Sequence, residues 1–196
     1  PSFAGLQIWV AMKNLLIEDS VSMGKAIKAV LETQGHVVQW IVGLRSVSAD
    51  SSNAIGIDEA DQDDQVTPQE IDVAFVDGQL AGEFTGPQVV SFLAANSVPC
   101  LGISTQSDLN QEMVALGAKL GLKKPVAFVA LVAGLLTPEL LLSVFSPAQK
   151  TRGKKANSLK LQHILSMETK LLTAEFETIR KQADEYFRPF LMEEFK

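Results

Sequence analysis

The sequence predicts a doubly wound α/β domain built on five parallel strands and followed by a long C-terminal helix. Two observations indicate this fold class. Short apolar runs alternate with stretches of helical periodicity, which is typical of a parallel sheet covered by helices on both faces. Acidic or hydroxyl residues directly follow several of these runs, as expected where strands end at the ligand-binding edge of an open sheet.

The elements of this fold follow from the periodicity. Strands are predicted at residues 14–17, 37–42, 71–76, 99–103 and 120–122. Helices are predicted at residues 21–34, 87–95 and 109–116, and a last helix after Pro125 that includes the apolar stretch 126–142. Ser20 is a suitable N-cap for the first helix, and Gly35 and Gly117 are suitable C-terminal stops.

Four segments lie outside this alternation. Residues 1–11 form an apolar N-terminal extension to the domain at 12–145, and residues 45–70 form an acidic insertion that is expected to be irregular or partly helical. Residues 146–157 combine Pro and Gly with a basic cluster, which predicts a linker. Residues 158–196 predict a helical tail, whose apolar stripe either packs along its own domain or forms a dimer or partner interface.

Composition narrows the class of function. The 196-residue chain carries a formal net charge of -6, which disfavours binding to the phosphate backbone of nucleic acids. The single cysteine, Cys100, lies in an apolar run and is expected to be a buried thiol in a reducing, cytoplasmic compartment. The stretch 126–142 contains Pro138 and Glu139 and is short for a bilayer crossing, so no membrane partner is expected. The first residues lack a basic leader and a cleavage site, so no signal peptide is predicted.

Charged side chains and one hydroxyl are expected to meet at the carboxyl ends of the predicted strands. Glu18 and Asp19 follow the first strand, Asp77 the third, Ser104 the fourth and Lys124 the fifth. Clustered carboxylates repel one another unless a cation neutralises them, and oxygen ligands suit Mg²⁺. Such a group of side chains is suited to placing a phosphoryl group on a carboxylate, with metal and lysine balancing the charge.

Four motifs occur in a fixed order at these strand ends. They are the acidic pair in LLIEDS at 15–20, the strand and loop DVAFVDGQLAGEFTG at 72–86, the strand 99–104 that ends in Ser104, and Gly117-Ala118 followed by Lys124-Pro125. In this order they resemble the motifs of response-regulator (CheY-like) receiver domains of two-component signalling, over about residues 12–143. The flavodoxin-like receiver fold is the fold that this resemblance implies.

The resemblance also implies a role for each matching residue. Asp77 would be the phosphoacceptor, Lys124 would contact the phosphoryl group, and Ser104 would move toward it as a switch. Asp19 would bind Mg²⁺ directly and Glu18 through water, with Asp77 and the backbone carbonyl of Gln79 as further ligands. The partners would be a sensor histidine kinase or phosphotransfer protein and a downstream protein target, with homodimerisation through the tail helix as a further interaction. The protein would not be an enzyme with an external product.

The sequence departs from the receiver pattern in three places. Gly121 stands where receivers usually have an aromatic switch residue, Ala81 stands where proline is common, and the insertion 45–70 is unusual. A phosphorylation-independent pseudo-receiver, acting as a dimerising or docking scaffold, is therefore the alternative. A metal-dependent phosphatase is disfavoured, because Gln79 replaces the second aspartate that such enzymes use. His163 in the tail lacks the small residues and lysine expected after a phosphotransfer histidine.

Overall fold

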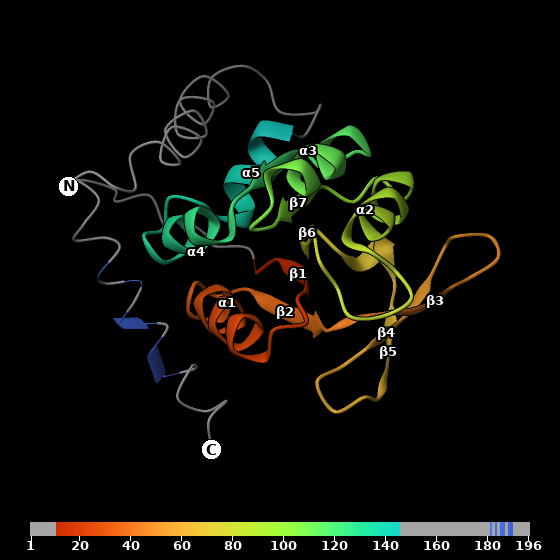
Figure 1. Cartoon of the computed structure of the whole chain (residues 1–196), viewed down its shortest axis with the longest axis horizontal. Coiled ribbons are helices and arrows are strands. Elements are labelled where there is room, and N and C mark those ends of the chain that lie inside the picture. The colour runs from red at the N-terminus through yellow and green to blue at the C-terminus, as the bar shows by residue number, and fades with distance from the viewer. Residues whose placement is uncertain (1–10, 146–180, 182, 184, 187, 190–196) are drawn as a thin grey trace, which may run out of the picture.

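The computed structural model describes residues 11–145 and residues 181, 183, 185, 186, 188 and 189 (Figure 1). Five parallel strands form the main sheet: β1 (Lys13–Ile17), β2 (Val37–Ile41), β6 (Val73–Asp77), β7 (Cys100–Ile103) and β8 (Leu120–Leu122). Their order across the sheet is β2-β1-β6-β7-β8. This confirms the predicted doubly wound five-stranded sheet, and each predicted strand differs from the observed one by at most two residues at an end.

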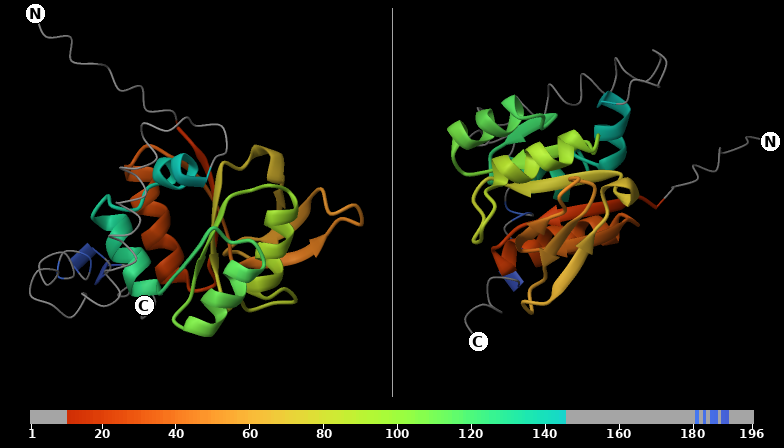
Figure 2. Two further views of the ribbon diagram at one scale, coloured as in Figure 1. Left: turned by 90° about the horizontal axis from the view of Figure 1, so that it is seen from above. Right: turned by 90° about the vertical axis from the view of Figure 1, so that its right-hand side faces the viewer.

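Helices cover both faces of this sheet (Figure 2). They are α1 (Val21–Thr33), α2 (Gly86–Ala95), α3 (Ser107–Ala115), α4 (Lys124–Val132) and α5 (Pro138–Phe145). The α1 and α4 helices lie on one side of the sheet, and α2 and α3 lie on the other. Ser20 caps α1 as predicted, because its hydroxyl accepts a hydrogen bond from the backbone N–H of Met23.

The core has two layers because successive side chains of a strand point to opposite faces. Leu15 and Ile17 of β1 pack with the apolar residues of α2, whereas Leu16 between them packs with those of α1 and α4. Cys100 belongs to the α2 layer and is 2% exposed, so the prediction of a buried thiol is confirmed. Burial raises the pKa of Cys100 to about 12, which keeps the thiol protonated and unreactive.

The prediction of an irregular or partly helical segment at residues 45–70 is wrong. This segment belongs to a three-stranded antiparallel sheet made of β3 (Gly43–Val47), β4 (Ala54–Ile57) and β5 (Asp63–Val66), which a 3₁₀ turn, η1 (Pro68–Glu70), joins to the main sheet. We call it the meander. Its buried residues Leu44, Ala54 and Val66 pack into the α2 layer, so the meander takes the position of the helix expected between β2 and β6.

Turn chemistry explains why this segment forms strands. The carboxylate of Asp50 accepts hydrogen bonds from the N–H of Ser52 and from two serine hydroxyls, and Ser51 in the same turn has a φ of 56°. In the second turn, the carboxylate of Asp58 accepts from the N–H groups of Ala60 and Gln62. Acidic and serine side chains therefore close two hairpins, and the polar composition reflects those turns.

The prediction of one helix over the stretch 126–142 is also wrong. The α4 helix ends at Val132 and α5 begins at Pro138. Gly134 between them has a φ of 65°, which ends α4 in the left-handed conformation that glycine adopts without strain. Pro138 then opens α5, where a missing N–H costs nothing.

The tail lies mostly outside the described residues, as do the extension at 1–10, the linker and His163. Its described residues are helical, and Ala183 is 1% exposed in the core layer of α1 and α4. The ring centroids of Tyr186 and Phe128 are 6.3 Å apart. This part of the tail therefore packs against its own domain. No helix within the described part of the chain is long and apolar enough to cross a membrane.

The meander should contribute to the stability of the whole domain. Leu44 is 1% exposed in the α2 layer, so Leu44→Ala is expected to lower the free energy of unfolding by about 3 kcal/mol, through lost apolar contact and an unfilled cavity. Urea denaturation measures this change. Ser46→Ala on an exposed position of the same strand is the control and should change it by less than about 0.5 kcal/mol. Equal, small effects of both substitutions would show that the meander does not pack on the domain.

Candidate active site

The sheet brings the predicted site residues to its carboxyl edge. Glu18 and Asp19 follow β1, Asp77 is the last residue of β6, Ser104 follows β7, and Lys124 is the first residue of α4 after β8. Because β1 and β6 are neighbours, the acidic pair lies beside Asp77 although about 60 residues separate them in the chain. Glu18, Asp77 and Ser104 are all buried, with exposures of 1%, 3% and 0%.

The ammonium of Lys124 joins the two buried carboxylates. Its Nζ donates to Asp77 Oδ2 at 2.7 Å and to Glu18 Oε1 at 2.9 Å. These pairs connect residues 47 and 106 positions apart, so they tie the start of α4 to the ends of β1 and β6. The other Asp77 oxygen, Oδ1, accepts a hydrogen bond from the N–H of Gln79 at 3.1 Å.

Burial dominates the electrostatics of this pair. Burial and then the charge of Asp77 raise the pKa of Glu18 to about 7, against the opposing influence of Lys124. Burial also raises the pKa of Asp77, although the Lys124 ammonium and the Gln79 N–H oppose it. Burial alone would lower the pKa of Lys124, but the two carboxylates outweigh it and raise that pKa. One ammonium therefore does not compensate two buried carboxylates.

Asp19 completes the acidic cluster and depends on a departure from the receiver pattern. Its Oδ2 accepts a hydrogen bond from the backbone N–H of Ala81 at 2.9 Å. The proline that is common at this position in receivers has no N–H, so Ala81 supplies a contact that proline could not make. This bond holds the acidic pair against the loop that follows Asp77.

Ser104 lies against the backbone that follows Asp77. A Cβ atom placed on Gly78 would stand 2.9 Å from Ser104 Oγ, so only glycine fits between the two strand ends. Ser104 Oγ accepts from the N–H of Gln106 at 3.1 Å. The structure thus brings the predicted switch hydroxyl to the loop that follows Asp77.

Two positioning residues were missed or only partly understood from the sequence. Asn110 is 7% exposed in α3, and its amide Nδ2 donates to the Ser104 carbonyl at 3.1 Å. Trp40 of β2 donates its indole N–H to the Glu18 carbonyl at 2.9 Å. The sequence gives only a weak indication that Asn110 positions other residues. It is a polar residue with low helix propensity inside a short helix.

The structure gives a steric reason for Gly121 at the position of the aromatic switch residue. A Cβ atom on Gly121 would stand 2.7 Å from the backbone oxygen of Asn110. The α3 helix therefore approaches β8 too closely for any side chain there. Asn110 therefore lies against Gly121 of β8 and is also hydrogen-bonded to the Ser104 carbonyl.

Among solved structures, this chain is similar to receiver domains. The receiver domain of the Francisella response regulator 1452 is 15% identical, with a TM-score of 0.45 over 66% of this chain and 95% of that chain. A Burkholderia pseudomallei response regulator with a phosphorylated aspartic acid, calcium ion and citrate is 16% identical, with a TM-score of 0.44 over 78% of this chain and 74% of that chain. The Vibrio cholerae chemotaxis protein CheY4 is 22% identical, with a TM-score of 0.40 over 68% of this chain and 94% of that chain. No protein-family model and no curated protein sequence matches the chain.

The strand order decides the fold. Counting only the parallel strands along the chain, the order β2-β1-β6-β7-β8 is 2-1-3-4-5, the flavodoxin-like order that receiver domains share. The chain has the receiver fold. This assignment rests on the strand order, and the similarity to solved structures carries no assignment of activity or partner.

The chemistry of the acidic cluster fits Mg²⁺. One carboxylate oxygen from each of Glu18, Asp19 and Asp77 lies within 4.8 Å of the others, and burial raises the pKa values of Glu18 and Asp77, so a bound cation would stabilise their charged forms. Hard divalent ions take such oxygen ligands. Gln79 follows at the start of the loop, and its carbonyl as a further ligand stays a prediction.

The pKa of Glu18 has a consequence for stability that can be measured. Between the ordinary value of 4.5 and about 7, the folded protein binds this proton more tightly than the unfolded chain, so stability falls as pH rises through that window. Glu18→Gln removes the cost of the buried charge. In metal-free buffer it should therefore raise the free energy of unfolding by on the order of 2 kcal/mol at about pH 8 and change it little at about pH 5.

Urea denaturation with a metal chelator at both pH values tests this expectation. Glu112→Gln on the exposed side of α3 is the matched control and should show no pH-dependent difference. A Glu18→Gln variant that is less stable than wild type at about pH 8 would mean that pairing with Lys124 outweighs the burial cost.

Proposed function

We propose that this chain is the receiver domain of a two-component response regulator, phosphorylated on Asp77 by a histidine kinase or a phosphotransfer protein. One observation carries the proposal: a buried aspartate ends a central strand, with a lysine ammonium 2.7 Å from it and two further carboxylates within 4.8 Å. This combination provides a nucleophile, a cation for the incoming phosphoryl oxygens and ligands for a divalent ion.

In the proposed reaction, an Asp77 carboxylate oxygen attacks the phosphorus of a phosphohistidine on the partner. The new bond is an acyl phosphate O–P bond, the P–N bond breaks, and the histidine leaves with its electron pair and takes up a proton. Mg²⁺ would supply positive charge to the phosphoryl oxygens. Lys124 would balance the charge that arrives on Asp77, and Glu18 and Asp19 would hold the metal. The protein has no external product in this scheme.

Signalling would start at Ser104. Its hydroxyl lies beside the loop after Asp77, and its carbonyl accepts the hydrogen bond of Asn110. A movement of Ser104 toward a phosphoryl oxygen would therefore pull on Asn110, and with it on α3 and β8. We propose that Asn110 transmits this change to a downstream protein partner, in the absence of an aromatic residue at position 121.

The alternative is a pseudo-receiver that signals by protein contact without phosphorylation, with the tail helix as a dimerising or docking element. Gly121 and the meander favour this alternative, because both alter the region between the phosphoacceptor and the surfaces that receivers use. The two readings differ in one measurable property, the binding of a phosphoryl mimic at Asp77.

Beryllofluoride binding separates the two readings. Wild-type protein is expected to bind beryllofluoride saturably in millimolar Mg²⁺, because the mimic places fluorines where phosphoryl oxygens would meet Lys124 and the metal. Trp40 is hydrogen-bonded to Glu18 and provides a fluorescence signal near the site. Asp77→Asn should abolish binding, whereas Asp108→Asn on an exposed position of α3 should leave it unchanged. Folded wild type that binds no beryllofluoride would establish the pseudo-receiver.

Mg²⁺ binding is expected to depend on pH. Since the pKa of Glu18 is about 7 without metal, binding at about pH 6 must displace a proton, and the apparent affinity should be roughly tenfold weaker there than at about pH 8. Calorimetry in two buffers of different ionisation enthalpy measures the released proton. Glu18→Gln should remove the proton release, and an affinity independent of pH in wild type would contradict the assignment of Glu18 to the metal site.

A further inference from the structure

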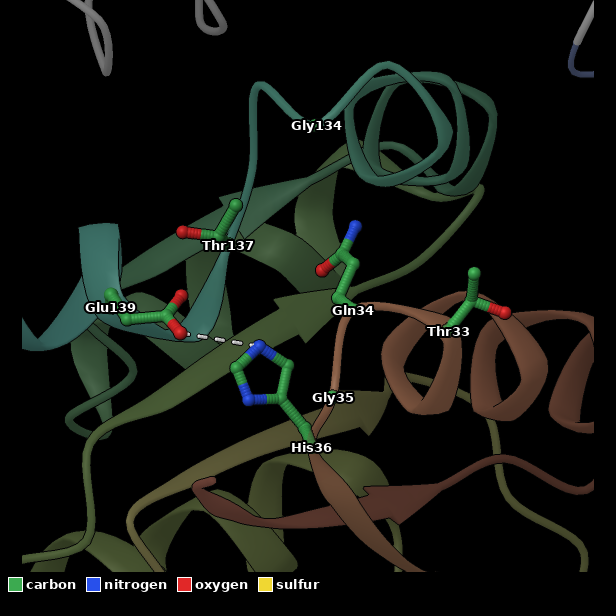
Figure 3. A pocket seen from close by; sticks show the side chains of 7 residues that line it. All are labelled: Thr33, Gln34, Gly35, His36, Gly134, Thr137 and Glu139. Carbon is green, nitrogen blue, oxygen red and sulfur yellow. Dashed lines mark ion pairs between the residues drawn. The ribbon is translucent and has the colours of Figure 1, made fainter. Parts of the chain in front are cut away.

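A pocket with a mainly apolar surface and a few polar groups lies at the opposite edge of the sheet from Asp77. It has a volume of about 510 Å³, and its described lining includes Gln34, Gly35, His36, Gly134, Thr137 and Glu139 (Figure 3). His36 immediately precedes β2, whose first residue pairs with the first residue of β1, so the pocket is at the amino-terminal edge. The proposed phosphorylation chemistry uses none of these residues.

Several hydrogen-bond acceptors in the pocket receive no hydrogen bond from the described residues. Gln34 Oε1 and both carboxylate oxygens of Glu139 are buried and have no hydrogen-bond partner among the residues that the structure describes. His36 Nε2 lies 3.3 Å from Glu139 Oε1, which is ion-pair distance, but the geometry does not form a hydrogen bond. The His36 side chain is 2% exposed, and its Nδ1 also has no partner. Buried acceptors of this kind are costly unless a ligand supplies the donors.

The orientation of Gln34 is fixed by the protein. Its amide Nε2 donates to the Leu131 carbonyl of α4 at 3.1 Å. Turning the amide over would place two oxygens against each other, so Oε1 must be the atom left unpaired. Figure 3 shows this oxygen on the side of the amide that faces Glu139 and Thr137.

Helix termini add to the negative potential. The last residue of α1, Thr33, and its cap, Gln34, line the pocket, and so does Gly134 just beyond the end of α4. The carboxyl ends of helices carry partial negative charge and attract cations. No lysine or arginine is among the described residues that line the pocket, and the described lining residue that lies at ion-pair distance from the carboxylate of Glu139 is His36.

We propose that this pocket binds the ammonium or guanidinium group of an organic cation. Such a group donates several hydrogen bonds at once and would satisfy Glu139 and Gln34 Oε1 together. A cavity of about 510 Å³ has room for a short aliphatic chain behind the charged group. The cation is either a free amine or guanidine, or a basic side chain of this chain's own cluster at Lys150, Arg152, Lys154 and Lys155.

The test is a titration of the full chain with n-butylammonium and n-butylguanidinium chloride, followed by NMR of the histidine side chains. The chain has two histidines, so His36 reports binding and His163 is the internal reference. Saturable shifts of His36 are expected at millimolar ligand. Glu139→Gln, which keeps the shape and removes the charge, should weaken binding at least tenfold, and Gln34→Ala should weaken it independently.

Matched controls separate this site from the proposed receiver chemistry. Glu32→Gln removes a nearby exposed carboxylate outside the pocket lining and should leave the affinity unchanged. Asp77→Asn should also leave it unchanged, so failure of one proposal is distinguishable from failure of the other. If uncharged n-butanol binds as well as the cations, or if Glu139→Gln and Glu32→Gln behave alike, the proposal is overturned.

A further variant identifies the source of the cation. In full-length protein with Lys150, Arg152, Lys154 and Lys155 all changed to Gln, a higher affinity for n-butylammonium would show that the chain's own basic cluster normally competes for the pocket. An unchanged affinity would show that the ligand is a free organic cation. Both results support a cation site, and absence of His36 shifts in wild type and in this variant would refute it.

Discussion

The ammonium of Lys124 between Glu18 and Asp77 is the contact on which the carboxyl edge of the sheet depends. Two carboxylates at this depth would repel each other and lose hydration, and the lysine is the positive charge that the described residues place between them. The contact requires β1 beside β6 and requires the turn after β8 to return toward both. The strand order and the start of α4 together allow Lys124 to reach both carboxylates. The resulting contact connects parts of the domain that lie far apart in the chain.

The single charge of Lys124 does not fully compensate the two buried carboxylates, and this affects which ligands the site attracts. Burial keeps the pKa values of Glu18 and Asp77 above their ordinary range even with Lys124 in place. A site that lacks positive charge attracts a divalent cation. In the proposed reaction, a bound cation would also balance the negative charge of an incoming phosphoryl group. The loop after Asp77 orients two of the carboxylates. The Ala81 N–H donates to Asp19 and the Gln79 N–H donates to Asp77. These bonds fix the carboxylates before any ligand arrives.

The sequence predicted the sheet and the meeting of charged side chains at its carboxyl edge, because strand ends and charged side chains coincide in the same short motifs; the roles of these residues stay predictions. It failed where structure depends on local turns or on the path of another element. In β5 only Val66 is buried, so its pattern does not distinguish a strand from a polar loop. The break between α4 and α5 at Gly134 lies within a continuous apolar stretch, so the apolar pattern did not predict it. The contacts of Ala81 with Asp19 and of Asn110 with Ser104 join residues whose proximity no spacing along the chain reveals.

The α4 helix connects the two sites of opposite chemical character. Lys124 at its start contacts the acidic cluster, and Gly134 just beyond its end lines the pocket of unpaired acceptors. Nine residues of helix span roughly 13 Å, and residues Val126 to Leu131 between the two ends are buried. A helix packed this tightly moves as a unit. Coupling between the two proposed sites would need a ligand at Asp77 that moves the whole helix, and by thermodynamic reciprocity it would act equally in both directions. The fold thus places the proposed phosphorylation site and the proposed cation site at the two ends of one buried helix.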